Sequence, residues 1–252
     1  MATAAAFENP LALSERAAAA LGGERWTDAG VTSYVSSAFD PFLNQSFVTA
    51  GADPREAVHR LAGRPAFVWM AVQPLPGARL GMERAGFVLA AFTAMDADSG
   101  GDSDVSDGDA LAALRDPRDV AAWHAVYSEV LGPDPRSQEE WLRLHGALGP
   151  EGAAAVWPWL RRVGDEPAAA AALFVDGRTA GLYCFATREP FRRRGLASEL
   201  VGVCRRQARR LGATRCVLQA TPAARAMYAR TGFAEHETVP IFVRRLPTSR
   251  EA

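Results

Sequence analysis

The sequence predicts an α/β (α+β) fold in which helices flank a mixed sheet, and three patterns in the last third of the chain support this prediction. Apolar runs typical of strands alternate there with amphipathic stretches, in the order strand, strand, helix, strand, helix, strand, strand. Asp176-Gly177 separates the first two runs and is typical of a two-residue hairpin turn. The stretch 194–211 has one apolar stripe with arginines opposite it, and Gly212 is a natural stop for that helix.

Local signals predict the individual elements in chain order. An apolar run over 67–72 lies between prolines and suits a buried strand. Asp116 and Pro117 are a typical N-cap and first residue for a helix that continues to Leu131. The other expected elements are helices over 77–84, 141–148, 157–163 and 223–230, and strands over 88–95, 168–175, 179–187, 215–220, 233–239 and 241–246.

Composition excludes several classes of function. Of the 252 residues, 48% are hydrophobic and 23% are charged, which suffices for a sizeable core. The formal net charge of −1 gives no global positive field, so we expect neither a nucleic-acid nor a membrane partner. All 28 basic residues are arginines, which excludes a lysine Schiff base and a P-loop.

The three cysteines, Cys184, Cys204 and Cys216, are too few and too widely spaced for a zinc site or a disulfide framework. We therefore expect no metal and a reduced, cytoplasmic protein. The alanine-rich first 23 residues have no basic region before them and do not resemble a signal peptide. No stretch approaches 18 uncharged apolar residues, so no transmembrane helix is expected.

An aspartate-rich stretch over 96–109 predicts a linker between two units. It holds six aspartates, three glycines and three serines, and such a segment cannot bury enough surface to fix one conformation. A calcium loop is the alternative, but the glutamate that an EF-hand needs at its twelfth position is missing. The predicted units are therefore 1–95, the linker 96–109, and 110–252.

The segment 187–198 points to an anionic ligand. It joins an expected strand to an expected helix, and a helix N-terminus offers free N–H groups and about half a positive charge to a phosphate. Gly195 allows close approach of the backbone, and between Arg188 and Arg215 nine arginines oppose two glutamates, a local charge of +7. The alternative is an arginine-rich helix with a solvated face.

Two motifs resemble the GNAT N-acetyltransferase superfamily. Arg192-x-x-Gly195-x-Ala197 resembles its Q/R-x-x-G-x-G/A pyrophosphate loop, and Tyr228 within MYARTGF resembles its aromatic marker before Gly-Phe. The resemblance covers 168–244. Glu189 replaces a frequent proline, and Thr221-Pro222 replaces a frequent asparagine.

The resemblance implies an N-acetyltransferase that uses acetyl-CoA, or another acyl-CoA, to acylate a small-molecule or peptide amine. The pyrophosphate would bind the amides of 193–198, and the pantetheine arm would lie beside the end of the strand over 185–187. Tyr228 would protonate the departing CoA thiolate; its alternative role is packing. The donor-binding residues implied are Phe185, Ala186, Thr187, Arg192, Arg193, Arg194, Gly195, Leu196, Ala197 and Ser198.

The residues leave the general base open. Glu189, His236 and Glu237 are candidates, and a base is dispensable where water removes the amine proton. We expect Cys184 to be a core residue, because no histidine is placed to activate it. The remaining histidines are expected to be structural: His59, His124 and His145.

The first 95 residues faintly resemble the second unit, as a degenerate repeat without the cofactor loop. Ala85-Gly86-Phe87 parallels Thr231-Gly232-Phe233, and Met82 stands where Tyr228 would be. An all-helical cap is the alternative. The rival functions are a non-catalytic acyl-CoA sensor and a GNAT-fold O-acyltransferase or decarboxylase, and the protein could be a monomer or a homodimer.

Overall fold

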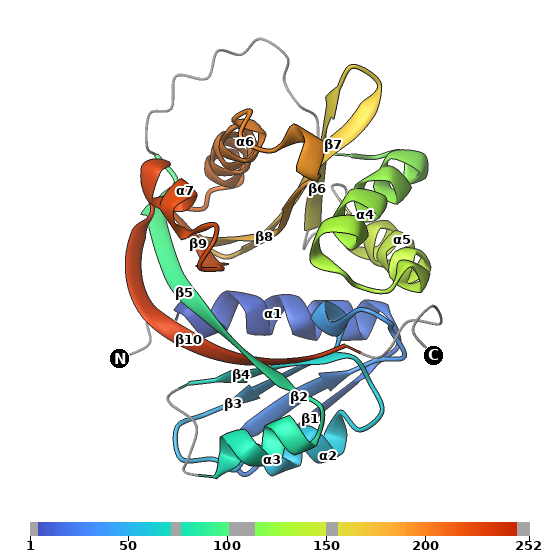
Figure 1. Cartoon of the computed structure of the whole chain (residues 1–252), viewed down its shortest axis with the longest axis vertical. Coiled ribbons are helices and arrows are strands. Elements are labelled where there is room, and N and C mark those ends of the chain that lie inside the picture. Colours follow the sequence, from blue (N-terminus) through green and yellow to red (C-terminus); the bar gives the residue numbers. More distant parts are fainter. Residues whose placement is uncertain (1–4, 72–76, 101–113, 150–155, 246–252) are drawn as a thin grey trace.

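The computed structural model describes residues 5–71, 77–100, 114–149 and 156–245, and a single mixed sheet runs through these ranges (Figure 1). We call 5–100 the N-terminal half and 114–245 the C-terminal half. The strand order of the sheet is β1-β2-β3-β4-β10-β5-β9-β8-β7-β6. The predicted α/β class with helices flanking a mixed sheet is confirmed.

The helices and strands of the N-terminal half are α1 (Ala5–Ala20), β1 (Glu24–Asp28), β2 (Val31–Val35), η1 (Pro41–Leu43), β3 (Gln45–Val48), α2 (Arg55–Arg60), β4 (Ala66–Met70), α3 (Ala78–Arg84) and β5 (Val88–Asp98). Those of the C-terminal half are α4 (Pro117–Leu131), η2 (Pro135–Ser137), α5 (Gln138–Leu148), β6 (Val156–Val163), β7 (Glu166–Asp176), β8 (Thr179–Thr187), η3 (Glu189–Phe191), α6 (Leu196–Arg210), β9 (Arg215–Ala220), α7 (Arg225–Arg230) and β10 (Ala234–Arg244).

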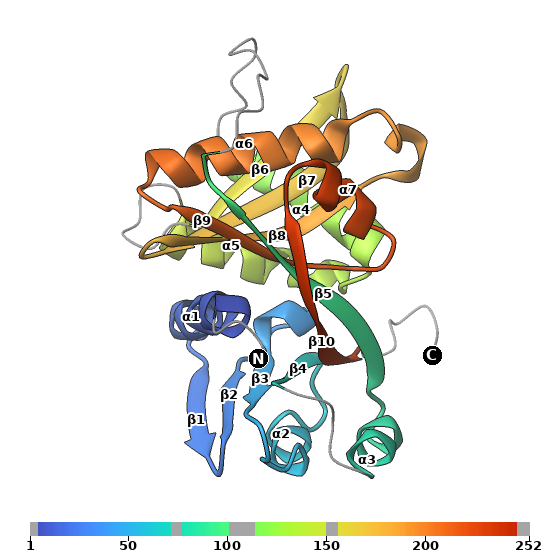
Figure 2. The same ribbon diagram turned by 90° about the vertical axis from the view of Figure 1, so that its left-hand side faces the viewer.

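The two halves have the same strand topology and exchange their last strands. In each half three antiparallel strands lead to a parallel pair joined across a helix: β3 and β4 across α2, and β8 and β9 across α6. Strand β10 then pairs with β4, β5 pairs with β9, and β5 and β10 pair with each other at the centre. Figures 1 and 2 show β5 and β10 running together between the halves.

The alanine-rich strand β7 lies in the middle of the C-terminal layers. Its residues 168–174 are all buried, because α6 covers one face of the strand and α4 covers the other. Burial on both faces explains why the run is continuously apolar instead of alternating. Helix α1 also packs against β7, β8 and α5, so that it joins the N-terminal half to the C-terminal half.

Three predictions about elements were wrong. The segment 157–163 is the edge strand β6 and not a helix, and an edge strand tolerates Pro158. The last two predicted strands are one strand, β10, with a register irregularity between Glu235 and Thr238. Residues 96–98 belong to β5 and not to a linker, because each of them pairs with a residue of β9. The predicted linker residues 101–109 lie outside the described residues.

The two Gly-Phe turns that suggested a repeat have the same structure. Gly86 and Gly232 have φ of +81° and +88°, in the left-handed region. In each turn an arginine donates to the carbonyl before the glycine and lies over the phenylalanine ring, with Arg244 4.5 Å from the first ring centroid and Arg205 5.9 Å from the second. The strands of the N-terminal half exclude the all-helical alternative.

One ionic cluster holds the exchanged strands together. Asp96 of β5 accepts hydrogen bonds from Arg215 of β9 and from His236 of β10. Burial raises the pKa of Asp96, but the hydrogen bonds from His236 and Arg215 outweigh burial, so that the net pKa is lowered. The ionised carboxylate therefore stabilises the fold, and this contribution is lost as pH falls through the lowered pKa.

We predict that Asp96→Asn lowers the free energy of unfolding by about 1–3 kcal/mol at pH 6, since the amide has one acceptor oxygen and cannot replace the carboxylate toward both Arg215 and His236. The difference from the parent should shrink as the pH falls below about 3.9, where the carboxyl also protonates in the unfolded chain. Urea unfolding at several pH values measures it, with Asp28→Asn at the exposed end of β1 as the control. Equal losses in the two variants would contradict the role of the cluster.

Candidate functional site

The parallel strands β8 and β9 separate after a short paired stretch. Thr179–Gly181 pair with Arg215–Val217, and beyond Gly181 the two strands diverge. The cause is a bulge in β8, where Cys184 and Phe185 together oppose one residue of β7. Cys184 has a φ of +56°, which bends the strand away from β9. The divergence leaves the β9-facing edge of β8 without a strand partner among the described residues.

The equivalent pair in the N-terminal half stays closed. All four residues of β3, Gln45–Val48, pair in parallel with Phe67–Met70 of β4 without a register shift. The side chain of Gln45 also accepts a 2.6 Å hydrogen bond from Trp69 across the pair. Of the two parallel pairs described, the one in the C-terminal half is therefore the pair that opens.

A loop of three exposed arginines lies between η3 and α6. Buried Phe191 and Leu196 anchor the loop at its two ends, while Arg192 donates from Nε to the carbonyl oxygen of Thr187 at 3.1 Å. Arg193 and Gly195 have φ of +60° and +82°. Left-handed residues of this kind turn successive N–H groups outward, which makes an anion-binding concavity. An open pocket lies over this loop, lined by Glu189, Pro190 and Arg192–Arg194.

Gly195 is needed for its backbone conformation. No described atom lies within 4 Å of the Cβ that a substitution would add, so space does not require glycine there. The left-handed φ does, because it costs other residues about 1–2 kcal/mol. Gly195 makes no side-chain cap, and the first N–H groups of α6, including those of Ala197 and Ser198, have no partner within the helix.

Tyr228 of α7 is 6% exposed and forms part of a cavity wall. Its ring makes edge-to-face contacts with Phe185 and Phe233, each at a centroid distance of 5.9 Å. Burial raises the pKa of its hydroxyl well above the ordinary value of 10. Tyr228 is therefore protonated at neutral pH, as a proton donor must be.

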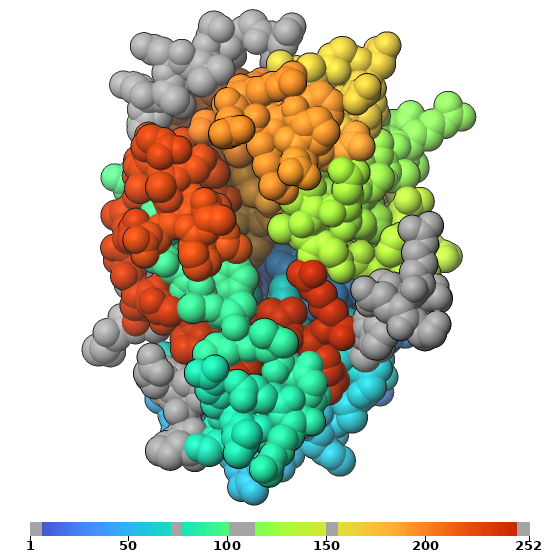
Figure 3. All heavy atoms as spheres, in the orientation of Figure 1, coloured from blue at the N-terminus to red at the C-terminus, as the bar shows by residue number. Residues whose placement is uncertain are grey.

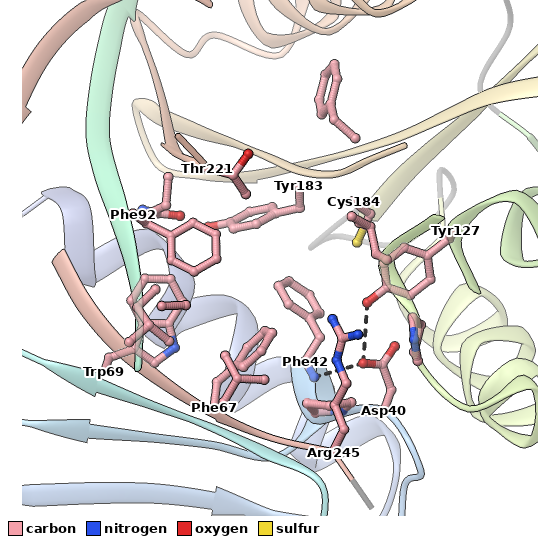
Figure 4. A pocket seen from close by; sticks show the side chains of 18 of the residues that line it. Asp40, Phe42, Phe67, Trp69, Phe92, Tyr127, Tyr183, Cys184, Thr221 and Arg245 are labelled. Carbon is pink, nitrogen blue, oxygen red and sulfur yellow. Dashed lines mark hydrogen bonds between the residues drawn. The ribbon is translucent and has the colours of Figure 1, made fainter. Parts of the chain in front are cut away.

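The cavity next to Tyr228 has a volume of about 610 Å³ and lies between the two halves. Its upper wall comes from the open end of β8 and β9, and its lower wall from η1, β4, β5 and β10 (Figure 4). In Figure 3 the surface is hollowed between the segment that holds α7 and the helix α4. Most of the lining is apolar, and it includes eight aromatic residues: Phe42, Phe67, Trp69, Phe92, Tyr127, Tyr183, Phe185 and Tyr228.

One buried carboxylate lines this cavity. Asp40, the N-cap of η1, is 1% exposed and accepts from the backbone N–H of Phe42 and from Trp141 Nε1, both at 2.8 Å. The hydroxyl of Tyr127 donates to the same carboxylate at 3.3 Å. Burial raises the pKa of Asp40, while the hydrogen bonds from Trp141, Phe42 and Tyr127 lower it by less. The result is a carboxylate that is more basic than usual.

The candidate bases that the sequence suggested lie elsewhere. Glu189 is exposed beside the arginine loop, and His236 is the partner of Asp96. Neither residue lines the described cavity, nor does Glu237. His124 is buried against Ser137 with a hydrogen bond of 2.9 Å, and burial lowers its pKa to about 4, as suits a structural histidine. His59 and His145 are also absent from the described lining.

Cys184 packs against a hydrophobic core cluster, as expected, and it also lines the cavity wall. The bulge turns its half-buried side chain toward Tyr127 (Figure 4). Burial and the nearby Asp40 raise the pKa of the thiol well above 9, which keeps it neutral. A neutral thiol is a poor nucleophile, so the geometry does not favour an acyl-cysteine intermediate.

The part of the cavity around Asp40 could not be predicted from the sequence. Asp40, Phe67, Trp69 and Tyr127 gave no functional signal, because they are separated along the chain and meet only in the folded protein. Asp40-Pro41 is typical of a helix start, and a capping aspartate is ordinary at such a position. Thr221, noted in the sequence only as a departure from a family pattern, also lines the cavity.

Among the residues that the structure describes, no helix is both long and apolar enough to span a membrane. No group of three or more histidine, cysteine, aspartate or glutamate side chains among these residues is arranged to hold a metal ion.

We predict that Cys184 in the native protein reacts with iodoacetamide at pH 7.5 at least about tenfold more slowly than a free cysteine, because its raised pKa leaves little thiolate. Mass spectrometry of the labelled peptides measures the rate, and the protein unfolded in urea serves as the control in which all three cysteines react. A rate equal to that of free cysteine would contradict the assignment of Cys184 as a neutral wall residue.

Comparison with known proteins agrees with this geometry. Residues 119–233 match the model of the acetyltransferase (GNAT) family. This matched range includes the open strand pair, the arginine loop and Tyr228. No protein with a curated description matches the sequence.

Three solved structures share the fold at low identity. A GCN5-related N-acetyltransferase from Kribbella flavida has a TM-score of 0.63 and 18% identity, with 99% of each chain covered. A conserved protein of unknown function from Staphylococcus epidermidis has a TM-score of 0.65 and 11% identity, covering 90% of this chain and 96% of that chain. A GCN5-related N-acetyltransferase from Sphaerobacter thermophilus has a TM-score of 0.54 and 15% identity, with coverage of 87% and 78%.

These matches agree with the two motifs in the sequence, and they support acyl transfer from an acyl-CoA in general. The part of the chain from 119 to 233 is a domain of the GNAT acetyltransferase family, set in a structure that has the GNAT fold.

Proposed function

We propose that this protein is an N-acetyltransferase that moves the acetyl group of acetyl-CoA to a primary amine. The observation that carries the proposal is the joint occurrence, within the family domain, of an opened parallel strand pair and an arginine loop at the start of α6. A donor with an anionic pyrophosphate and an amide-bearing arm matches both features.

The pyrophosphate would bind at the loop over 192–198. Its charge would be met by Arg192, Arg193 and Arg194 and by the free N–H groups at the start of α6. The acidic residue in the first turn of this helix, Glu199, is held by Arg161 at 3.0 Å, which limits its repulsion of an anion. Leu196, Ala197 and Ser198 supply the backbone of that first turn.

The pantetheine arm would lie along the open edge of β8, at Phe185, Ala186 and Thr187. Its two amides can hydrogen bond to backbone groups that β9 leaves unpaired after the strands diverge. This placement would bring the thioester to the bulge at Cys184, within the cavity that Tyr228 lines.

The chemistry follows from these positions. The neutral amine attacks the thioester carbonyl, the C–N bond forms, and the C–S bond breaks to give the CoA thiolate. Tyr228 donates its proton to that thiolate and recovers one from the acylated nitrogen. Its buried position favours this role, because an unprotonated thiolate is poorly stabilised in a partly dry cavity.

The N-terminal half would be a degenerate copy of the GNAT unit that shapes the acceptor cavity. Its closed β3–β4 pair leaves no room for a second pantetheine arm, and the helix that follows β3, α2, has only six residues. We therefore expect one donor per chain. The rival functions are a non-catalytic acyl-CoA sensor and a GNAT-fold O-acyltransferase or decarboxylase. The tests below distinguish them from an N-acetyltransferase.

We predict that Gly195→Glu weakens acetyl-CoA binding at least about tenfold, because the side chain adds backbone strain and a negative charge beside the pyrophosphate. Gly51→Glu is the matched control, since Gly51 has a φ of +83° and open space around its Cβ. Calorimetry gives both affinities and should give one equivalent bound to the parent. Unchanged affinity in Gly195→Glu, or two equivalents per chain, would contradict the assigned donor site.

We predict that Tyr228→Phe keeps acetyl-CoA affinity and lowers turnover by about 10²–10⁴-fold, the range for a positioned proton donor. Phenylalanine fills the same space, so that the loss would not come from a cavity. Tyr34→Phe, a buried tyrosine outside the cavity, is the control. Turnover of acetyl-CoA to free CoA is followed by mass spectrometry, and equal rates in both variants would remove Tyr228 from the mechanism.

A further inference from the structure

We propose that the acceptor is a primary amine with an apolar body, and that Asp40 binds its ammonium group and takes up the proton it must lose before attack. This inference rests on the acetyl transfer proposed above. It adds the substrate class and the general base, which the C-terminal half alone does not provide.

Asp40 lies close to the proposed position of the thioester. Its carboxylate lines the same cavity as the bulge of β8, and Figure 4 shows Asp40 and Cys184 on either side of Tyr127. The thioester is proposed to lie at this bulge, so an amine bound to Asp40 would face the carbonyl carbon. Of the residues that line the described cavity, Asp40 alone carries an acidic side chain.

The hydrogen bonds of Asp40 leave it able to bind one more donor. Its two oxygens have about four acceptor positions, and the donors Phe42 N–H, Tyr127 hydroxyl and Trp141 Nε1 fill three of them. A buried carboxylate is most stable when its remaining position faces a cation. An ammonium group supplies both the charge and the missing hydrogen bond.

The rest of the lining sets the body of the acceptor. The wall opposite β8 is mostly apolar, with Phe67, Trp69, Phe92 and Ile241, and these side chains cannot satisfy hydroxyl groups. The polar residues Gln219, Thr221 and Arg245 also line the cavity and lie outside this apolar group. Burial of apolar surface there contributes about 25 cal/mol per Å². The rings of Phe42 and Tyr183, 5.5 Å apart, add aromatic faces near the charged end.

The proton balance is complete without further groups. The ammonium gives one proton to the Asp40 carboxylate, and the neutral amine attacks the thioester. The second proton leaves the nitrogen and restores Tyr228 after it has protonated the thiolate. Asp40 then releases its proton to solvent, so that one ammonium ion and one acetyl-CoA give one amide, one CoA thiol and one proton.

Other charged and titratable groups face Asp40 from every neighbouring element. These are Tyr127 of α4, Glu140 of α5, Cys184 of β8 and Arg245 after β10. Arg245 lines the same cavity and its charge lowers the pKa of Asp40, but its side chain is exposed, so solvent weakens this attraction. The base must be ionised to act, hence kcat/KM should fall as the pH drops through the pKa of Asp40.

The first experiment uses the unchanged protein and a graded set of amines: ethylamine, butylamine, 2-phenylethylamine and glucosamine, the last as a polar amine of similar size. We expect kcat/KM to rise with apolar size and glucosamine to react at least about tenfold more slowly than 2-phenylethylamine. 2-Phenylethanol is the neutral analogue of 2-phenylethylamine. We also expect its inhibition constant to be at least about tenfold higher than the dissociation constant of 2-phenylethylamine. Mass spectrometry of the acetylated products gives the rates.

The second experiment compares Asp40→Asn with Asp134→Asn. Both aspartates cap a 3-10 helix before a proline, but only Asp40 lines the described cavity. We expect Asp40→Asn to keep acetyl-CoA affinity, lower kcat/KM for 2-phenylethylamine by about 10²–10⁴-fold, and lose the acidic limb of the pH profile. Asp134→Asn should behave like the parent.

The outcomes separate this inference from the function on which it rests. Preference for glucosamine, equal binding of 2-phenylethanol and 2-phenylethylamine, or an unchanged pH profile in a folded Asp40→Asn variant would overturn the inference and leave acetyl transfer intact. Tight acetyl-CoA binding without acetylation of any amine would overturn the transfer itself. If Asp40→Asn does not fold, the comparison of amine and alcohol on the parent still decides the case.

Discussion

The separation of β8 from β9 is the constraint on which the rest of the site depends. A bulge at Cys184 and Phe185 ends the parallel pairing after Gly181 and leaves backbone groups of β8 without a strand partner. Because unpaired backbone groups are costly when buried, such an opening persists only where solvent or a ligand satisfies them. The arginine loop, Tyr228 and the cavity all lie around this opening. The closed β3–β4 pair shows the same topology without a bulge, and no such opening forms there.

The exchange of strands explains how the N-terminal half, which has no donor loop, contributes to the site. Strand β5 completes the sheet of the C-terminal half beside β9, and β10 completes the sheet of the N-terminal half beside β4. The lower wall of the cavity is therefore fixed to the upper wall through the sheet itself, and Asp96 ties the three strands at one end. Because the lower wall is fixed in this way, a buried carboxylate such as Asp40 lies at a constant position relative to the open end of β8 and β9.

Features encoded in short segments could be predicted from the sequence. The helices α6 and α7 depend on local patterns, and both lie where they were expected, while the roles of the arginine loop and of Tyr228 stay predictions. The segment 157–163 was misassigned as a helix, because its two tryptophans and its proline fit neither the hydrophobic period of a helix nor that of a strand. It is a strand because it pairs with β7. The bulge, the exchanged strands and Asp40 could not be predicted, since each arises from contacts between residues far apart in the chain.

The most direct test of the account is a crystal structure of the protein with bound CoA. The account predicts one CoA per chain, with its pyrophosphate on the amides at the start of α6, its pantetheine amides paired to Phe185–Thr187, and its sulfur facing Tyr228 across the cavity. A CoA molecule bound at the β3–β4 pair, or one whose arm avoids the open edge of β8, would contradict it.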